Sequence, residues 1–427
     1  MIPVFPRLDH SAQCPLCQSE MRADDWAIPG MRCLAHFTCQ HCHEEFWGDL
    51  PVGHAMFYPN LLRVSTGEVF DEMDVPWFRK LLLKSVKAKN KLEPELHVEE
   101  YKPVRQAVLV NCLDVYFGHS LLKLFNAQWY LDHRPDLSVI ILVPKFLKWM
   151  VPDGVSEVWS VDVSLRNGYF WSDRFAAQIR KRAETFEQFS ISMASHPLPA
   201  DYDIARFTKV APFPLEEWRA RLNRPTVSFI WREDRLWSDL RRNHLLKKIE
   251  SVDGQIRHIV KLATLLKERF PALDFGVVGL GKDGSFPNFI SDLRTSRIDM
   301  TIERQWCARY AASHLVIGIH GSNLLLPSAH AGSTLNLLPP HKWGNFSVDM
   351  VLRRGSEFET LFCYRNIPAE CAPESVARIA ISMISDFPKA MLRLSDKWKT
   401  HNSSLPATAW FEAGKVTKHK KSPAQEK

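Results

Sequence analysis

The sequence predicts an α/β protein in which a small cysteine-rich module precedes two halves, each a Rossmann-like domain with a doubly wound parallel sheet. Three observations support this prediction. Four cysteines form two paired motifs within the first 42 residues, strands alternate with helices from Val104, and a second series of the same kind follows a proline-rich crossing. Regular alternation is typical of parallel sheets, because each parallel connection needs a crossover.

The composition is that of an ordinary globular protein, with 45% apolar and 24% charged residues. Of the net charge of +7, the last thirteen residues contribute +4, from five lysines and one glutamate. The body is therefore nearly neutral, and nucleic acid is not an expected partner. Residues 401–427 are expected to be a disordered basic tail, with weak contact to acidic surfaces, such as a membrane periphery, as the alternative.

The first ten residues lack a basic region followed by an apolar run, and no window reaches the ~18 apolar residues of a membrane helix. Five of the nine cysteines fall in the first 42 residues and the other four are scattered singly. We therefore expect a cytoplasmic protein without a membrane span.

Residues 1–50 carry the most specific metal signal. Cys14-Pro-Leu-Cys17 and Cys39-Gln-His-Cys42 are separated by twenty-one residues, a length that suits a small hairpin-bearing zinc ribbon. Four thiolates would fill every position around Zn²⁺, so the zinc would be structural. Acidic and basic residues are mixed here, which favours a folding role at least as much as partner binding. The alternative ligands are Cys33, His36, His41 and His43.

Residues 51–100 are expected to be a connector, with a strand at 60–64 and a helix at 76–91. The first half, residues 101–215, is expected to contain strands at 107–113, 138–144 and 155–163 and helices at 119–136, 145–150 and 172–189. Asp114 and His119 follow the first strand, and functional groups gather at the carboxyl ends of such strands. His119 fits a general base, a substrate contact or a helix cap.

The second half, residues 216–400, follows Pro197, Pro199, Pro212 and Pro214. Its expected strands are at 226–232, 273–281, 315–318 and 334–338, and its expected helices are at 255–269, 301–312 and 373–394.

A small polar turn, Gly318-Ile-His320-Gly321-Ser322-Asn323, ends one of these buried strands. Gly321 lets a ligand approach the backbone, and Ser322 or Asn323 can cap the segment that follows. Arg232 and Arg235 follow the first strand of the same sheet and therefore point to the same edge. Arginine forks suit a diphosphate, whereas the alternative is a local salt-bridge turn within Arg232-Glu-Asp-Arg235.

Gly279-Leu-Gly281-Lys-Asp-Gly284, with Asp299 downstream, formally matches a dinucleotide fingerprint. Such a fingerprint belongs to the first strand of its domain and opens into a helix, whereas here the strand is the second and Ser285-Phe-Pro287 interrupts. An NAD(P)-dependent oxidoreductase is therefore kept only as a further alternative.

Two α/β halves of similar size, with a phosphate-like turn and arginines in the second, describe the GT-B arrangement of sugar-nucleotide glycosyltransferases. Ile302-Glu303-Arg-Gln305, residues 308–323 and residues 331–340 resemble the C-terminal signature of glycosyltransferase family 61. Asp114-Val-Tyr-Phe-Gly-His119-Ser-Leu-Leu is similar to that family's aromatic-His-Trp-Leu segment. The resemblance covers residues 104–385 and leaves the cysteine-rich module outside. The chain departs from the family pattern at Ile319, Ser322, Asn323 and Ser120, which affects the donor sugar more than the reaction type.

The resemblance implies a hexosyl- or pentosyltransferase of polysaccharide biosynthesis, which moves a sugar from a nucleoside-diphosphate sugar to a saccharide, lipid-linked or protein acceptor with inversion. Because the chain has no clear Asp-x-Asp metal motif, Arg232, Arg235 and the Gly321–Asn323 turn would hold the diphosphate. His320 would contact the donor and Glu303 a ribose or sugar hydroxyl. His119 is the preferred base, with Asp114 as the runner-up. The main alternative is a non-catalytic zinc-ribbon protein that binds a nucleotide or a partner.

Overall fold

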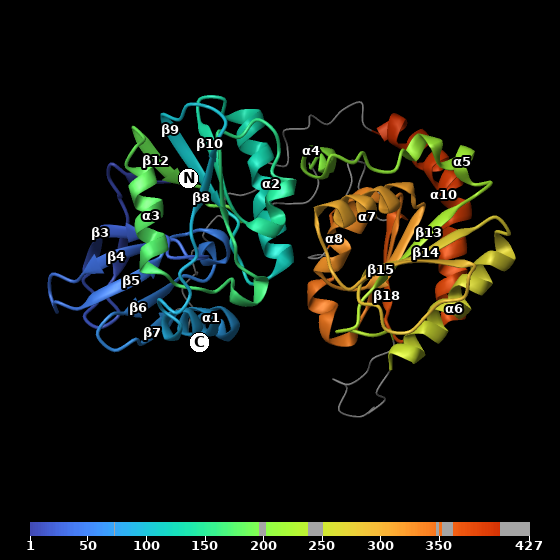
Figure 1. Ribbon diagram of the computed structural model, residues 1–427, viewed down its shortest axis with the longest axis horizontal. Helices are drawn as coiled ribbons and strands as arrows, with labels where there is room; N and C mark the ends of the chain where they lie inside the picture. Colours follow the sequence, from blue (N-terminus) through green and yellow to red (C-terminus); the bar gives the residue numbers. More distant parts are fainter. Residues whose placement is uncertain (72, 196–201, 238–250, 347–349, 352–361, 402–427) are drawn as a thin grey trace, which may run out of the picture.

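The computed structural model describes residues 1–71, 73–195, 202–237, 251–346, 350–351 and 362–401. Three six-stranded sheets lie in two lobes, with two sheets in the first lobe and one in the second (Figure 1). Residues 402–427, which make up the expected basic tail apart from His401, lie outside the described residues. Among the described helices, none combines the length and apolar character needed to cross a bilayer.

The first sheet has a parallel centre and antiparallel edges. Four strands, β12, β9, β10 and β11, pair in parallel, while β1 and β8 add antiparallel edges. In spatial order the strands are β1 (Ile2–Phe5), β12 (Gln188–Ile191), β9 (Gln106–Asn111), β10 (Ser138–Pro144), β11 (Glu157–Val161) and β8 (His97–Glu100).

Helices and 3₁₀ turns connect these strands. Alternate residues of β9 and β10 pack into different cores, one with α2 and the other with α3, so the two helices cover opposite faces. The connecting elements are α2 (Phe117–His133), η2 (Lys145–Met150), η3 (Leu165–Asn167) and α3 (Asp173–Ala183). The helix expected over 172–189 is too long, because β12 begins at Gln188. In β12 the apolar residues Phe189 and Ile191 alternate with Ser190, which is the two-residue period of a strand.

An antiparallel sheet builds the cysteine-rich module. It consists of β2 (Ser11–Gln13), β3 (Glu20–Ala27), β4 (Leu34–Thr38), β5 (Glu45–Asp49), β6 (Asn60–Arg63) and β7 (Val69–Asp71). This sheet shares one apolar core with α3 and the first sheet. After β5 come η1 (Gly53–Met56) and, beyond β7, α1 (Pro76–Lys87). Two strands of the expected connector, β6 and β7, therefore complete the module's sheet.

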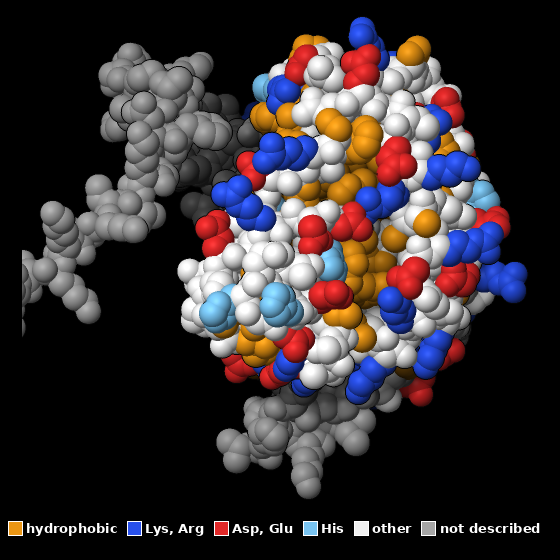
Figure 2. Space-filling model, turned by 90° about the vertical axis from the view of Figure 1, so that its left-hand side faces the viewer, with side chains coloured by type: hydrophobic (Ala, Val, Ile, Leu, Met, Phe, Trp, Pro, Cys, Tyr) orange, Lys and Arg blue, Asp and Glu red, His pale blue; other side chains and the backbone are white. Residues whose placement is uncertain are grey.

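The face of the molecule that lies at the left of Figure 1 includes β3 and β4 of this module. On that face, basic and acidic side chains are interspersed rather than separated by sign (Figure 2). A nucleic-acid interface is typically a basic stripe. The visible face lacks that pattern, while the folding role of the module stays a prediction.

The second lobe contains a wholly parallel sheet with a doubly wound strand order. In spatial order it runs β15 (Ile290–Thr295), β14 (Asp274–Leu280), β13 (Thr226–Trp231), β16 (Leu315–Ile319), β17 (Thr334–Leu338) and β18 (Tyr364–Pro368). Numbered from its first strand this is the order 3-2-1-4-5-6, which reverses between β13 and β16. Two of these strands, β15 and β18, were not predicted. β15 is an edge strand in which only Ile290 and Arg294 are buried, so it lacks the apolar run of the other strands in sequence.

Helices cover both faces of this parallel sheet (Figure 1). α6 and α10 pack on one face, and α7 and α8 lie on the face toward the first lobe. The helical elements of this part are α4 (Ile204–Thr208), η5 (Leu215–Glu217), α5 (Trp218–Arg221), α6 (Val252–Arg269), α7 (Met300–Ala312), η6 (Ser322–Leu324), α8 (Leu325–His330), η7 (Pro340–Asn345) and α10 (Pro373–His401).

One apolar core joins the two lobes. It contains Leu121 and Leu124 of α2 together with Leu324 and Leu325 at the start of α8, all fully buried. Gly118, near the start of α2, lies so close to the second lobe that a Cβ atom there would be 2.8 Å from the Cβ of Ser322. The start of α2 and the Gly321 turn are therefore in direct contact.

Candidate functional site

A large cleft lies between the lobes, where the carboxyl ends of the parallel strands face each other. Its volume is about 1400 Å³. The segments that line it follow β9, β10 and β11 in the first lobe and β13, β14, β15 and β16 in the second. Ligands of open α/β sheets bind at this edge, above the point where the strand order reverses. The reversal between β13 and β16 places Arg232 and Ser322 at that point.

The turn after β16 needs its glycine. Gly321 has φ of +149°, a region that side chains rarely adopt, and a Cβ atom there would meet Arg232 Nη1 at 2.1 Å. The expected side-chain cap is wrong: η6 and α8 show no side-chain cap bond, and Asn323 Oδ1 instead accepts from Arg232 Nη1 at 2.9 Å. The turn is therefore shaped around the arginine.

Arg232 and Arg235 converge on one atom of this turn. Each donates from Nη1 to the carbonyl oxygen of His320, Arg232 at 3.2 Å. Arg232 also forms a two-point ion pair with Asp234, at 2.9 and 2.6 Å. The segment thus forms the local salt bridge that was the alternative interpretation, and it also brings two guanidinium groups to the switch point, where diphosphate binding stays a prediction.

The His320 imidazole is not positioned to meet a ligand in the cleft, contrary to expectation. The residue is fully buried, and its Nδ1 lies 2.9 Å from Asn336 Nδ2. Burial, followed by the nearby Arg235, lowers the pKa of His320 to about 4, so the ring is neutral at pH 7. The backbone carbonyl is the part of His320 that faces the arginines.

Glu303 lies in the cleft and links the two lobes. Its Oε2 accepts a hydrogen bond of 2.6 Å from Trp149 Nε1 of η2. Burial raises the pKa of this carboxyl to about 7, with a further contribution from Asp299, while the Trp149 bond opposes the rise. Glu303 therefore titrates near neutral pH.

This pKa predicts a specific pH dependence of stability. A carboxyl whose folded-state pKa is raised holds its proton more tightly when folded, so its contribution to stability falls as pH rises from about 4.5 through about 7. We expect Glu303→Gln to gain thermal stability relative to wild type between pH 5 and pH 8, by up to about 3 kcal/mol. Melting temperatures at both pH values measure the effect, with Glu268→Gln, exposed on α6, as the control. An equal offset at the two pH values would contradict the prediction.

The glycine-rich loop after β14 does not form a dinucleotide fingerprint. It leads into β15 rather than into a helix. A Cβ atom at Gly281 would meet Glu233 Oε1 at 2.0 Å, and the same oxygen accepts from the backbone N–H of Asp283 at 3.3 Å. A carboxylate thus packs against this loop, and no helix N-terminus follows it to bind a pyrophosphate, which disfavours the oxidoreductase alternative.

Asp114 and His119 form a dyad at the end of β9. His119 Nδ1 lies 3.2 Å from Asp114 Oδ1, which also accepts from the backbone N–H groups of Val115 and Tyr116. Asp114 Oδ2 accepts from Lys123 Nζ at 2.9 Å. Burial alone raises the pKa of Asp114, but Lys123 and His119 hold it far below its usual value. Asp114 is therefore a buried anion that orients the imidazole.

Two residues of the expected connector complete the surroundings of His119. The His54 ring of η1 lies 4.5 Å from the His119 ring, and the Trp77 ring of α1 lies 6.2 Å from it. Burial, followed by the neighbouring His119, lowers the pKa of His54 to about 4, so His54 is neutral at pH 7. Sequence reasoning missed both residues, because neither belongs to a motif.

The dyad lies beside the cleft rather than among its lining residues. Phe117 and Ser322 line the cleft, and Gly118 contacts Ser322. Of the sequence-predicted residues, Arg232, Glu303, Ser322 and Asn323 line the cleft itself. Arg235, His320 and Gly321 lie immediately behind Arg232, while His119 directly follows Gly118, which contacts Ser322, and pairs with Asp114.

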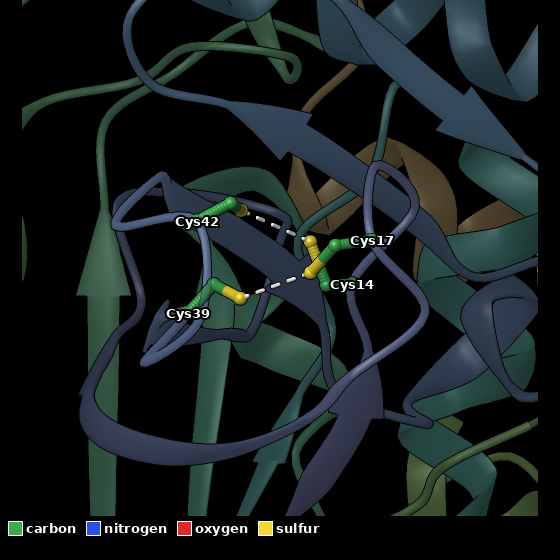
Figure 3. Close-up of side chains that lie close together, drawn as sticks. All are labelled: Cys14, Cys17, Cys39 and Cys42. Atoms are coloured by element: carbon green, nitrogen blue, oxygen red, sulfur yellow. Dashed lines mark hydrogen bonds between the residues drawn. The ribbon is translucent and has the colours of Figure 1, made fainter.

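The four expected zinc ligands form one cluster (Figure 3). Cys14 Sγ is 3.6 Å from Cys42 Sγ, Cys17 Sγ is 3.5 Å from Cys39 Sγ, and all four sulfur atoms lie within 4.8 Å of one another. Thiolates bound tetrahedrally at ~2.3 Å from Zn²⁺ are about 3.8 Å apart, so this donor set fits zinc.

The two motifs also have the same backbone shape. The N–H groups of Gln18 and His43, each one residue beyond a motif, donate to the carbonyls of Cys14 and Cys39, both at 2.9 Å. Gln18 and His43 both have positive φ, of 63° and 59°. The alternative ligands are occupied elsewhere or lie outside the cluster: His36 pairs with Asp24, and Cys33 contacts Asn111.

Comparison with solved structures finds several similar chains. E. coli ADP-heptose LPS heptosyltransferase II is 10% identical, with a TM-score of 0.37 over 65% of this chain and 98% of that one. The glycosyltransferase SnogD from Streptomyces nogalater is 15% identical, with a TM-score of 0.30 over 69% and 68%. TarM is 10% identical, with a TM-score of 0.25 over 93% and 78%. Comparison of the sequence with protein-family models and with curated proteins gives no match.

All three TM-scores lie below 0.5, and the strand order of the sheets defines the fold of this chain.

Proposed function

We propose that this chain is an inverting, metal-independent glycosyltransferase of the GT-B type that moves a sugar from a nucleoside-diphosphate sugar to an acceptor hydroxyl. One observation carries the proposal. The carboxyl edges of two parallel sheets face a common cleft, with paired arginines at the switch point of one sheet and an Asp–His dyad after a strand of the other. The resemblance of residues 104–385 to glycosyltransferase family 61 supports the same reaction.

The donor diphosphate would bind at Arg232, which lines the cleft, with Arg235 behind it. Planar guanidinium groups bind phosphate oxygens through paired hydrogen bonds and remain charged at all relevant pH values. Because Gly321 has no side chain, the Arg232 guanidinium can lie against it. Asn323 Oδ1 accepts a hydrogen bond from Arg232 Nη1 and so fixes the position of this nitrogen. His320 has a positioning role in this arrangement, since its carbonyl holds both arginines, and Glu303 would accept a hydrogen bond from a donor hydroxyl.

The transfer itself is a single in-line displacement. A bond forms between the acceptor oxygen and the anomeric carbon while the bond from that carbon to the diphosphate breaks, which inverts the configuration. The acceptor proton passes to His119 Nε2, because Nδ1 is engaged with Asp114. The negative charge of the departing diphosphate is stabilised by Arg232 and Arg235. Asp114 stabilises the imidazolium and stays ionised.

Zinc at Cys14, Cys17, Cys39 and Cys42 would be structural in this enzyme, because the four thiolates leave no open position. It would hold together the two motif turns of the module and take no part in the transfer.

Isothermal titration calorimetry with UDP and GDP tests the donor site. We expect one of the two nucleotides to bind wild type, and Arg232→Ala and Arg235→Ala each to weaken binding ~10- to 100-fold, because charge-assisted hydrogen bonds are lost. Arg257→Ala, exposed on α6, is the matched control and should bind as wild type does.

Two outcomes would contradict the proposal in different ways. Absence of binding of either nucleotide to wild type would exclude a donor site for these diphosphates. Arginine-dependent binding, without hydrolysis or transfer from any nucleotide sugar, would favour the non-catalytic binding protein instead.

A further inference from the structure

An exposed aromatic cluster lies beside the imidazole of the dyad. It consists of Trp77 of α1, Tyr116 at the start of α2, and His119 itself, and is called the aromatic platform below. The Tyr116 ring lies 4.8 Å from the His119 ring and 6.4 Å from the Trp77 ring. Trp77 is 38% exposed and Tyr116 is 48% exposed, so much of each side chain contacts solvent next to the residue proposed as the base.

The platform is held by contacts that fix its orientation. The His54 ring meets the Trp77 ring edge-on, with centroids 5.0 Å apart and an angle of 89°. Beneath Trp77, Phe78 is buried, and its carbonyl accepts from Arg32 Nη2 at 2.8 Å, while Arg32 forms a buried ion pair with Asp49. Through these contacts of Arg32, the cysteine-rich module fixes the position of α1. Rigid aromatic side chains bury ligand surface at little entropic cost.

We propose that the aromatic platform is the acceptor subsite and that its occupant is a pyranose ring of a saccharide, stacked against Trp77 and Tyr116. This inference rests on the proposed glycosyltransferase function. The apolar C–H face of a pyranose packs against an aromatic ring, while its hydroxyl groups remain at the rim. Stacking there presents a ring hydroxyl to His119, whose ring lies 6.2 Å from the Trp77 ring and 4.8 Å from the Tyr116 ring.

Two features favour a saccharide acceptor over the other ligands of this reaction. The platform belongs wholly to the first lobe and its module, whereas the arginines proposed for the diphosphate belong to the second lobe. The cavity on the inner side of His54, lined also by Phe78 and Asp114, has a volume of only about 20 Å³. An acyl chain therefore cannot extend inward from the imidazole, and an open aromatic surface suits a sugar face better than a lipid tail.

Saturation-transfer difference NMR on the full-length protein tests the inference. The probes are methyl β-D-glucopyranoside, methyl β-D-galactopyranoside, methyl α-D-mannopyranoside, methyl β-D-xylopyranoside and octyl β-D-glucopyranoside. We expect saturation of ring C–H protons for at least one methyl glycoside with wild type, and binding about tenfold weaker with Trp77→Ala. Trp77→Phe, which keeps an aromatic face, should restore most of the signal.

The matched control is Trp129→Ala, since Trp129 is 53% exposed on α2 and stacks on His133. It should bind as wild type does, and circular dichroism of each variant establishes that it is folded. Three results overturn the inference: no ring saturation in wild type with any methyl glycoside, equal saturation in Trp77→Ala and wild type, or saturation confined to the octyl chain.

UDP and GDP calorimetry on the same samples separates this inference from the proposed function. If Trp77→Ala changes neither nucleotide binding nor the glycoside signals, the proposed acceptor subsite is overturned. The proposed donor site is unaffected by that result. Loss of ring saturation in Trp77→Ala with unchanged nucleotide binding supports the platform as a separate acceptor subsite.

Discussion

Replacing His119 with asparagine is expected to lower the rate of sugar transfer by ~10²- to 10⁴-fold while leaving nucleoside-diphosphate binding unchanged. Asparagine can still donate a hydrogen bond to the Asp114 carboxylate, but its amide cannot take a proton from the acceptor. The side chain of His119 is 22% exposed, which makes the ring accessible. Transfer rates at saturating donor and calorimetric affinities for UDP or GDP measure the two effects.

His133→Asn is the matched control, because His133 lies at the other end of the same helix and is exposed. Asp114→Asn should give a similar loss of rate, since it removes the charge that orients His119 and stabilises its protonated form. A wild-type transfer rate in His119→Asn would show that another group accepts the proton.

Replacing Cys39 with serine is expected to abolish zinc binding and to unfold the cysteine-rich module. Structural zinc sites contribute apparent binding free energies of about 10–16 kcal/mol, far more than a single side-chain contact. Zinc content by atomic emission should fall from about one equivalent per chain to near zero, and the melting temperature should fall with it.

Cys33→Ala provides the control for this experiment. Cys33 lies in the same module but outside the cluster, and burial raises the pKa of its thiol to about 11, so it remains a neutral thiol at pH 7. This variant should retain its zinc. A wild-type preparation that is fully folded but contains no metal would contradict the proposal that the four cysteines bind zinc.

The sequence predicted best where the local pattern and the tertiary environment agree. The strand at 138–144 matches β10 in both bounds, because seven consecutive apolar-rich residues are buried on both faces of a parallel sheet. The paired CxxC motifs predicted the sulfur cluster for a similar reason, since the metal geometry is encoded in the spacing.

Prediction failed where tertiary contacts decide the structure. β15 is a half-exposed edge strand, and only its parallel pairing with β14 reveals it. β1 lies close to the cysteine motifs in sequence, yet it pairs with β12 of the first sheet.

The residues of the candidate site also fall into two groups, those that the sequence predicts and those that only the tertiary structure brings together. Asp114, His119, Arg232 and Arg235 could be found because each follows a recognisable buried strand. His54 and Trp77 reach His119 only through the fold of the module, so no spacing in the sequence could have placed them there. The His320 side chain likewise is buried and contacts Asn336 of the neighbouring strand, an environment that its own sequence segment does not reveal.

The apolar core shared by α2 and α8 has a consequence for how substrates enter. Swinging the lobes apart would expose Leu121, Leu124, Leu324 and Leu325 to water, at ~25 cal/mol for each Å² of apolar surface. The contact between Gly118 and Ser322 would be lost at the same time. A wide hinge motion is therefore a costly way to exchange substrates in this protein. The less expensive route is a local rearrangement of the cleft lining, where the Trp149–Glu303 hydrogen bond bridges the lobes.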